Sequence, residues 1–254
     1  MQGTINVIEQ AIEAGVKKIS VAGSVVSIAD TANPKPGSSE EDWVPASREL
    51  AHSQPTNYML HYLVSKVLAE KALWNLAEKH PDVNVASINP PFFIGPFAPA
   101  LVIPTGDYSM FSTNLVLFNA LIPGSKSQTP PIGFIDTRDV AASLIAGLEV
   151  PGRTRNIVAS PWFDLTEAVA YVGELHPEIK EELPKLTATG QKESPFSTEP
   201  SLKRLGIEVR PWKETVKATA DDLLRIEKEW ISKGVDVNAE GGLRDNPVRN
   251  MKLV

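Results

Sequence analysis

The chain contains no cysteine, and this absence excludes several kinds of site together. Disulfide frameworks, thiolate metal ligands and cysteine nucleophiles all need a sulfur that the sequence does not supply, and we expect no metal site. Positive charge is also scarce, because 31 acidic residues outnumber 25 lysines and arginines and leave a formal net charge of −6. Such a chain lacks the cationic surplus that binds phosphate backbones, so nucleic acid is not an expected partner.

Long hydrophobic runs are missing as well. No uninterrupted apolar segment reaches the ~18–20 residues that a membrane-spanning helix needs. The first 18 residues form an amphipathic pattern that includes Glu9 and Glu13, which is unlike the basic segment and apolar run of a signal peptide. The sequence therefore predicts a soluble, cytoplasmic protein that has no membrane partner.

Ordinary globular composition accompanies these absences. The 254 residues are 42% hydrophobic and 22% charged, which excludes a disordered or fibrous protein. A chain of this length forms one large domain, or one domain and a smaller unit.

Helical and strand-like segments alternate along the chain. Ile5, Ile8 and Ile12 recur at helical spacing within 4–14, and Gly15 is a candidate helix stop before the β-rich run 17–23. Further helices are expected at 58–79, 113–122, 165–175, 201–206 and 212–233, strands at 83–90 and 155–160, a strand that enters a helix at 133–150, and loops at 30–57, 90–113 and 185–198. This alternation predicts an α/β fold with a mostly parallel sheet.

Tyr62 and Lys66 stand four residues apart in the longest predicted helix, so both side chains project from one face. A tyrosine hydroxyl titrates near ~10 and exchanges protons poorly at neutral pH on its own. An ammonium about 5 Å away, at an effective dielectric constant of roughly 20, favours the phenolate by about 3 kcal/mol. Such a pair can exchange a proton with a carbonyl oxygen. The same spacing also occurs where a tyrosine packs and a lysine is solvated.

Two other segments follow predicted strands. Ser24 comes directly after the strand at 17–23, and the carboxyl ends of strands line the ligand crevice of an open α/β sheet. Its hydroxyl can hold a substrate carbonyl or simply stabilise a turn, and Ser27 is a neighbouring competitor. The segment NPPFFIGP (89–96) ends the next strand, and its prolines make a rigid turn that can face a flat ring.

The order of these parts is more specific than any one of them. A serine after one strand is followed 38 residues later by YLVSK (62–66), and NPPFFIGP follows the next strand. Together with GTINVIEQAIEAGVKKISVAGSV, YLVSKVLAEKALW, FIDTRDVAAS and KRLGIEVRPWKETVKATADDLLRIEKEW, these parts make the chain resemble the extended short-chain dehydrogenase/reductase family, within the NAD-dependent epimerase/dehydratase superfamily. The most similar branch is that of the dihydroflavonol-reductase-like and cinnamoyl-CoA-reductase-like carbonyl reductases, and the resemblance covers essentially the whole chain.

The resemblance implies roles for individual residues. In that family a tyrosine donates and accepts the proton, a lysine binds the nicotinamide ribose and a serine orients the substrate carbonyl. These catalytic roles correspond to Tyr62, Lys66 and Ser24. The implied cofactor is NADP or NAD, with NADP favoured, and its nicotinamide end would contact Tyr62, Lys66, Pro90, Pro91, Phe92 and Phe93.

The resemblance also implies a small-molecule substrate, namely a hydrophobic or aromatic aldehyde or ketone that is held beside Ser24. Four aromatic residues in and after the loop are candidates for this substrate site, with packing in the core as the alternative: Phe97, Tyr108, Phe111 and Phe118. Asp136 and Asp139 lie near the head of a predicted helix, where a carboxylate more commonly caps and braces than catalyses.

The family's glycine-rich turn has no counterpart in this sequence. Complete members open with a strand, a G-x-x-G-x-x-G turn that holds the pyrophosphate, and a helix. No glycine cluster precedes Ser24, and we therefore expect an N-terminally truncated Rossmann-like fold. The strand at 17–23 would then be a sheet edge with unpaired amides, where a homodimer or another partner can attach.

We expect residues 1–96 to be the later part of a dinucleotide-binding domain. Residues 97–233 would form mainly a small substrate-binding subdomain, from which 133–160 returns to the sheet, and 234–254 would form a loose tail. The leading functional hypothesis is an NAD(P)H-dependent carbonyl reductase. The alternatives are a non-catalytic remnant that binds a partner and, ranked lower, a sugar-nucleotide epimerase or dehydratase.

Overall fold

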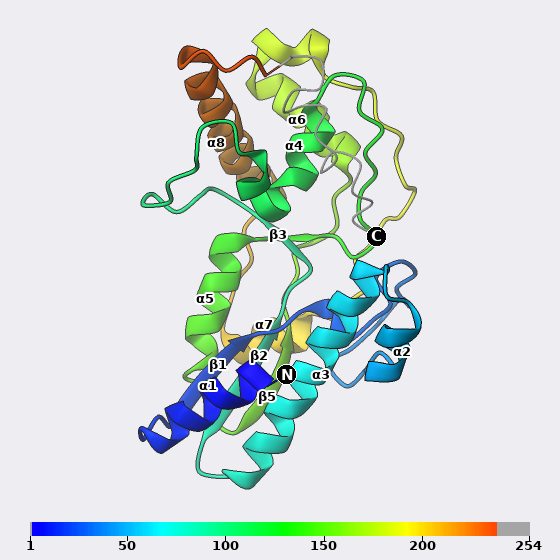
Figure 1. Ribbon diagram of the computed structural model, residues 1–254. Coiled ribbons are helices and arrows are strands. Elements are labelled where there is room, and N and C mark those ends of the chain that lie inside the picture. The colour runs from blue at the N-terminus through cyan, green and yellow to red at the C-terminus, as the bar shows by residue number, and fades with distance from the viewer. Residues whose placement is uncertain (1, 238–254) are drawn as a thin grey trace.

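A parallel sheet forms the centre of the lower lobe in Figure 1, which we call the sheet lobe. The fold comes from a computed structural model, and the structure describes residues 2–237. Among these residues, β1 (Lys18–Ala22), β2 (Asn84–Asn89) and β5 (Arg153–Ile157) pair in the order β1-β2-β5. The fold is therefore α/β and Rossmann-like, as the alternation of helices and strands predicts.

Helices cover both faces of this sheet. On one face, α1 (Gln2–Glu13) and α3 (Tyr58–Lys79) pack over an apolar cluster that includes Ile8, Leu73 and Val85. On the other face, α5 (Thr137–Gly147) and α7 (Glu199–Leu205) cover a second cluster that includes Ile88 and Leu205. Burial on both faces explains the apolar residues of β1 and β2.

β1 is an edge strand of the described sheet. The Lys17 carbonyl oxygen accepts from the Asn84 amide, and the Gly23 amide donates to the Ile88 carbonyl oxygen. The backbone groups of the odd-numbered residues of β1 therefore face β2. Since alternate residues of a parallel strand bond to opposite sides, the amides of Lys18, Ser20 and Ala22 point away from β2. The edge predicted at 17–23 is present in the part of the chain that the structure describes.

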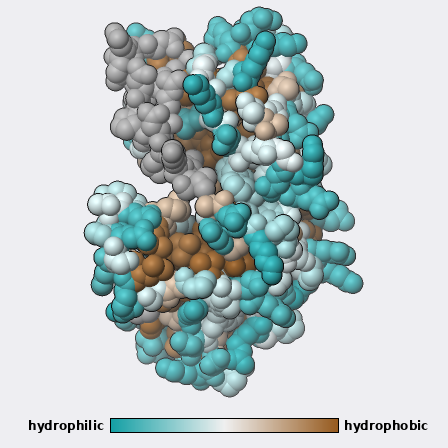
Figure 2. All heavy atoms as spheres, turned by 90° about the vertical axis from the view of Figure 1, so that its right-hand side faces the viewer, coloured by the Kyte–Doolittle hydropathy of each residue, from teal (hydrophilic) through white to brown (hydrophobic). Residues whose placement is uncertain are grey.

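The upper lobe in Figure 1, the helical lobe, contains α4 (Leu115–Leu121), α6 (Leu165–Leu175) and α8 (Trp212–Ser232). A separate pair of short strands, β3 (Phe92–Ile94) and β4 (Phe134–Asp136), lies at its base. Figure 2 shows a hollow between the two lobes, where hydrophobic side chains gather. The carboxyl ends of β1 and β2 and the first turns of α3 lie on the side of the sheet lobe that faces the helical lobe (Figure 1).

Several sequence predictions are confirmed closely. The helices expected at 58–79 and 165–175 correspond to α3 and α6 in full, and the Gly15 stop has a φ of 88° that suits glycine. The strand expected at 155–160 lies earlier in the chain than predicted, since β5 begins at Arg153 and ends at Ile157. Its first residues are polar and partly exposed, so hydrophobicity alone does not reveal them.

Short elements inside the expected loops were missed. The loop at 30–57 contains α2 (Arg48–Ser53), which Ser47 caps, and the loop at 90–113 contains β3 and most of η2 (Tyr108–Asn114). The turn η3 (Pro177–Glu182) also lies outside the predicted elements, and η1 (Val25–Ser27) follows Ser24. Segments this short carry too few periods for a hydrophobic pattern to be recognised.

Of the two described strands within the expected return at 133–160, β5 joins the main sheet, whereas β4 pairs with β3. The domain boundaries at 96 and 233 remain predictions. Of the expected tail, Val235 packs against the helical lobe and Val237 is buried, while 238–254 lie outside the described residues. None of the described helices is long and apolar enough to span a membrane.

Candidate active site

Tyr62 and Lys66 lie on one face of α3, within its first three turns. The Lys66 Nζ lies 5.8 Å from the centre of the Tyr62 ring, and the Tyr62 side chain is 43% exposed. Among the described residues, neither the Tyr62 hydroxyl nor the Lys66 ammonium has a hydrogen-bond or salt-bridge partner. Both polar groups are therefore available to an external ligand.

Ser24 begins the turn that follows β1. It is buried and extended in its backbone, and its Oγ accepts from the Val26 amide at 3.4 Å as the cap of η1. The Ser24 amide donates to Asn89 Oδ1 at 2.9 Å, which ties the end of β1 to the end of β2. The turn-forming role that the sequence left open is thus present, and a contact between Ser24 and substrate remains a prediction.

Ser27, the competitor of Ser24, has its hydroxyl engaged in the interior. It is 1% exposed, and its Oγ bonds to the Glu70 carboxylate and lies 2.8 Å from the Ser24 carbonyl oxygen. A hydroxyl held in this way is not free to meet a ligand. This geometry favours Ser24 over Ser27 as the serine of the site.

The contact between Ser27 and Glu70 brings the Ser24 turn and α3 together. Glu70 follows Lys66 by one helical turn and Tyr62 by two, so all three share one face of α3. At 1.5 Å per residue, Tyr62 lies about 12 Å from Glu70 along the helix axis, toward the first residue of α3. Because α3 runs opposite to the strands, this direction leads toward the side of the sheet lobe that faces the helical lobe (Figure 1).

The segment after β2 divides into buried and exposed residues. Pro90 and Pro91 are buried, and the Pro90 carbonyl accepts from the Val25 amide at 3.1 Å. Phe92 packs against the core, whereas Phe93 is 40% exposed. Of these four residues, Phe93 offers the largest accessible apolar side chain for a flat ring, and a cofactor contact for the segment remains a prediction.

The four candidate substrate aromatics gather in one cluster of the helical lobe. Tyr108, Phe111 and Phe118 are 2%, 1% and 6% exposed and pack around Trp230, with Phe97 against them. The Tyr108 hydroxyl donates to Glu227 at 2.6 Å. Core packing, the alternative stated for these residues, accounts for their positions, and the structure gives no separate support for a substrate contact.

Asp136 and Asp139 cap and brace, as the sequence predicts. Asp136 caps α5 and accepts from the Arg138 amide and guanidinium and from Thr215, while Asp139 pairs with Arg210. Burial raises the pKa of the Asp136 carboxyl, but the hydrogen bonds from Arg138 and Thr215 outweigh burial and hold that pKa below its ordinary value. Both carboxylates are committed to structure.

Sequence reasoning assigned no role to three polar residues near Ser24 whose side chains are buried: Glu70, Asn89 and Arg155. The Glu70 carboxylate pairs with Arg155 at 2.9 Å, and their side chains are only 4% and 9% exposed. A signal was available, because a glutamate four residues after Lys66 must share the Tyr62 and Lys66 face. His61 is half-buried, and its Nε2 lies 3.0 Å from the carbonyl oxygens of Ala51 and Gln54, which attaches α2 to α3.

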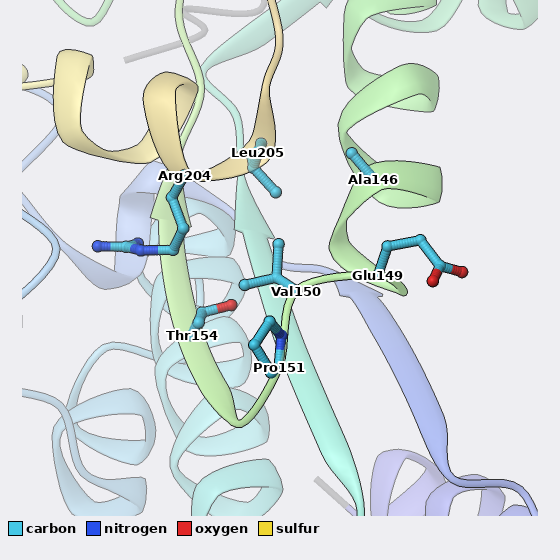
Figure 3. Close-up of a pocket in the computed structure, with 7 residues that line it drawn as sticks. All are labelled: Ala146, Glu149, Val150, Pro151, Thr154, Arg204 and Leu205. Atoms are coloured by element: carbon cyan, nitrogen blue, oxygen red, sulfur yellow. The ribbon is translucent and has the colours of Figure 1, made fainter.

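A cavity of about 550 Å³ lies at the other end of the strands. It is bordered by the end of α5, the start of β5 and α7, and its lining residues are Ala146, Glu149, Val150, Pro151, Thr154, Arg204 and Leu205. Figure 3 shows Arg204 and Glu149 directed away from the apolar centre near Val150 and Leu205. With its charged groups turned outward, this cavity does not bring polar groups together as a catalytic site does, and no predicted site residue lines it.

Comparison with known proteins finds a matching family model and similar reductases. The family model described as "NAD dependent epimerase/dehydratase family" matches residues 1–157. The NADPH-dependent methylglyoxal reductase GRE2 of Saccharomyces cerevisiae is 27% identical over 244 residues, which are 89% of this chain and 69% of that protein. Cinnamoyl-CoA reductase CAD2 of Medicago truncatula is 24% identical over 230 residues, which are 88% of this chain and 65% of that protein.

Solved structures share the fold. The crystal structure of Gre2 in complex with NADPH from Candida albicans has a TM-score of 0.74 and 22% identity, covering 88% of this chain and 69% of that one. The UDP-glucose-4-epimerase of Stenotrophomonas maltophila has a TM-score of 0.56 and 14% identity, covering 90% and 69%. The chain spans about two thirds of the length of the methylglyoxal reductases and of the cinnamoyl-CoA reductase CAD2 that it matches.

Proposed function

Because the chain belongs to the NAD dependent epimerase/dehydratase family, we propose that it carries the proton-transfer face of an NADPH-dependent carbonyl reductase. The substrate would be an aldehyde or ketone with a hydrophobic or aromatic body. The observation that carries this proposal is the pairing of Tyr62 and Lys66, whose polar groups lack partners among the described residues and whose side chains lie near each other on α3.

The residues present fit the nicotinamide end of the cofactor. The unpartnered Lys66 ammonium suits the hydroxyls of a ribose, and the exposed Phe93 ring suits the flat nicotinamide. The sequence has no G-x-x-G-x-x-G turn to hold a pyrophosphate. The names of the relatives support NADP over NAD, since the GRE2 reductase is NADPH-dependent and a Gre2 structure contains NADPH.

The chain's own residues would move one proton. When bound, a reduced nicotinamide supplies the hydride that the carbonyl carbon receives. The Tyr62 hydroxyl donates its proton to the carbonyl oxygen, so that the carbonyl becomes an alcohol and Tyr62 is left as phenolate. The Lys66 ammonium stabilises that phenolate by its positive charge. The Ser24 hydroxyl, at the carboxyl end of β1, orients the substrate carbonyl.

Removal of the Tyr62 hydroxyl tests this role. Tyr62→Phe should lower kcat for NADPH-dependent carbonyl reduction by at least about 100-fold, because a positioned acid contributes on that scale. Tyr58 supplies a matched control, since it lies one turn earlier on the same helix and is 81% exposed. Tyr58→Phe should leave kcat unchanged, and equal turnover in the two variants contradicts the proposal.

Lys66→Ala tests the partner of Tyr62. It should weaken NADPH binding and lower kcat together, and unchanged values of both would mean that the pair is structural. Titration with NADPH and NADH, followed by reduced-cofactor fluorescence, measures the binding. The alternative, a partner-binding chain without turnover, is supported by the open edge of β1 and predicts no cofactor binding even at millimolar concentration.

A further inference from the structure

Glu70 is a buried carboxylate on the same face of α3 as Tyr62 and Lys66. Its Oε1 accepts from Arg155 Nε at 2.9 Å, from Ser87 Oγ at 3.0 Å and from Asn89 Nδ2 at 3.3 Å. Its Oε2 accepts from Ser27 Oγ and from Arg155 Nη2 at 3.3 Å. The two oxygens therefore contact side chains of three segments, namely η1, β2 and β5.

One connection runs from Glu70 to the Ser24 amide through Asn89. Since Asn89 Nδ2 donates to the carboxylate, the amide group of Asn89 is oriented with Oδ1 toward Ser24, where it accepts at 2.9 Å. The acceptor at Glu70 supports this orientation together with Ser87 Oγ, to which Asn89 Nδ2 donates at 3.1 Å, because a donor at Glu70 would oppose Asn89 Nδ2.

A second connection reaches the same serine through its carbonyl. Ser27 Oγ lies 2.8 Å from the Ser24 carbonyl oxygen and also bonds to Glu70. A hydroxyl has a single hydrogen, so it donates to one of these acceptors at a time. Glu70 is thus linked to the backbone amide of Ser24 through Asn89 and to the backbone carbonyl of Ser24 through Ser27.

The charge of Glu70 is balanced within the interior. The Arg155 guanidinium stacks on the Trp43 ring at 3.7 Å and donates to the carbonyl oxygens of Glu40 and Asp42. A buried carboxylate without such a partner is strongly destabilising. The ion pair lets α3 keep an anionic acceptor at this depth, where an apolar residue would pack but would orient nothing.

We propose that Glu70 is a positioning residue, which holds Ser24 in a fixed register relative to the α3 face that carries Tyr62 and Lys66. The inference deepens the proposed function and rests on it. Glu70 acts through Asn89 and Ser27 and does not itself touch substrate. Replacement of Glu70 by methionine, which has a similar length but no carboxylate, should release Ser24 while it leaves Tyr62 and Lys66 chemically intact.

Hydrogen exchange at the Ser24 amide tests the positioning without any cofactor. In ¹⁵N-serine-labelled protein, Glu70→Met should speed exchange at Ser24 by about tenfold or more, because Asn89 loses the carboxylate that accepts from its Nδ2. Exchange at Ser143 and Ser201, which are buried elsewhere, should change less than twofold. Asp139→Asn is the matched control, since it removes another buried carboxylate that pairs with an arginine.

Equal acceleration at all three serines, or the same change at Ser24 in Asp139→Asn, overturns the proposal, because either result indicates general destabilisation. If Glu70→Met does not fold, Glu70→Asp keeps a negative charge in the interior but shortens the side chain by one methylene, which withdraws its oxygens from Asn89. Wild-type protection of Ser24 in Glu70→Asp would then overturn it. Kinetics separate the two proposals: unchanged turnover in Tyr62→Phe removes the proposed function, whereas the exchange result at Ser24 concerns Glu70 alone.

Discussion

At the scale of single residues, Gly23 decides whether β1 and β2 can be joined at their ends. A Cβ on Gly23 would lie 2.0 Å from Asn89 Oδ1 and 2.9 Å from Ser87 Oγ. Gly23→Ala should therefore displace Asn89, break its bond to the Ser24 amide and lower the free energy of unfolding by about 1–3 kcal/mol. Urea unfolding measures the loss. Gly3→Ala is the control, because nothing lies near that position, and it should not be destabilising.

At the scale of elements, Asp164 caps α6 and joins it to the segment near Thr189. Burial raises the pKa of the Asp164 carboxyl, but hydrogen bonds from Thr166 and Thr189 outweigh burial and leave the pKa below its ordinary value. A lowered pKa in the folded state stabilises the protein above the unfolded pKa, near ~3.9, and the stabilisation is lost as pH falls through the folded value.

Asp164→Asn should therefore be less stable than the wild type at pH 7, and the difference should shrink as pH falls below about 4. Thermal unfolding between pH 7 and pH 3 measures both proteins. Glu181 is exposed, and Glu181→Gln serves as the control. A difference between Asp164→Asn and the wild type that stays constant with pH would show that the carboxylate charge has no part in the cap.

At the scale of the whole molecule, the open edge of β1 is a place where chains can pair. The outward amides of Lys18, Ser20 and Ala22 lack a neighbouring strand among the described residues, and such an edge favours association. Ala22→Lys should reduce concentration-dependent association, as measured by sedimentation velocity, because charge on an edge opposes pairing. Val7→Lys adds the same charge on α1 away from the edge. Equal effects of the two substitutions would contradict a role for β1.

Periodicity in the sequence was sufficient for the long elements. α3 repeats its apolar positions over many turns, and α6 carries an acidic cap at Asp164, so both helices follow from local physics. The parallel, doubly covered sheet follows from the alternation of helices with buried strands. The pairing of Tyr62 with Lys66 needs only the geometry of one helix, which is why it could be predicted.

Tertiary structure decided the surroundings of Ser24. Glu70, Asn89 and Arg155 come from α3, β2 and β5, and their contacts join residues up to 85 positions apart, which no local pattern encodes. Tertiary packing also placed the rings of Tyr108, Phe111 and Phe118 in the core, since an aromatic in a proline-rich segment suits a pocket and an interior equally well. Local periodicity determines which segments are regular, whereas burial and charge pairing between distant segments determine what each polar group faces.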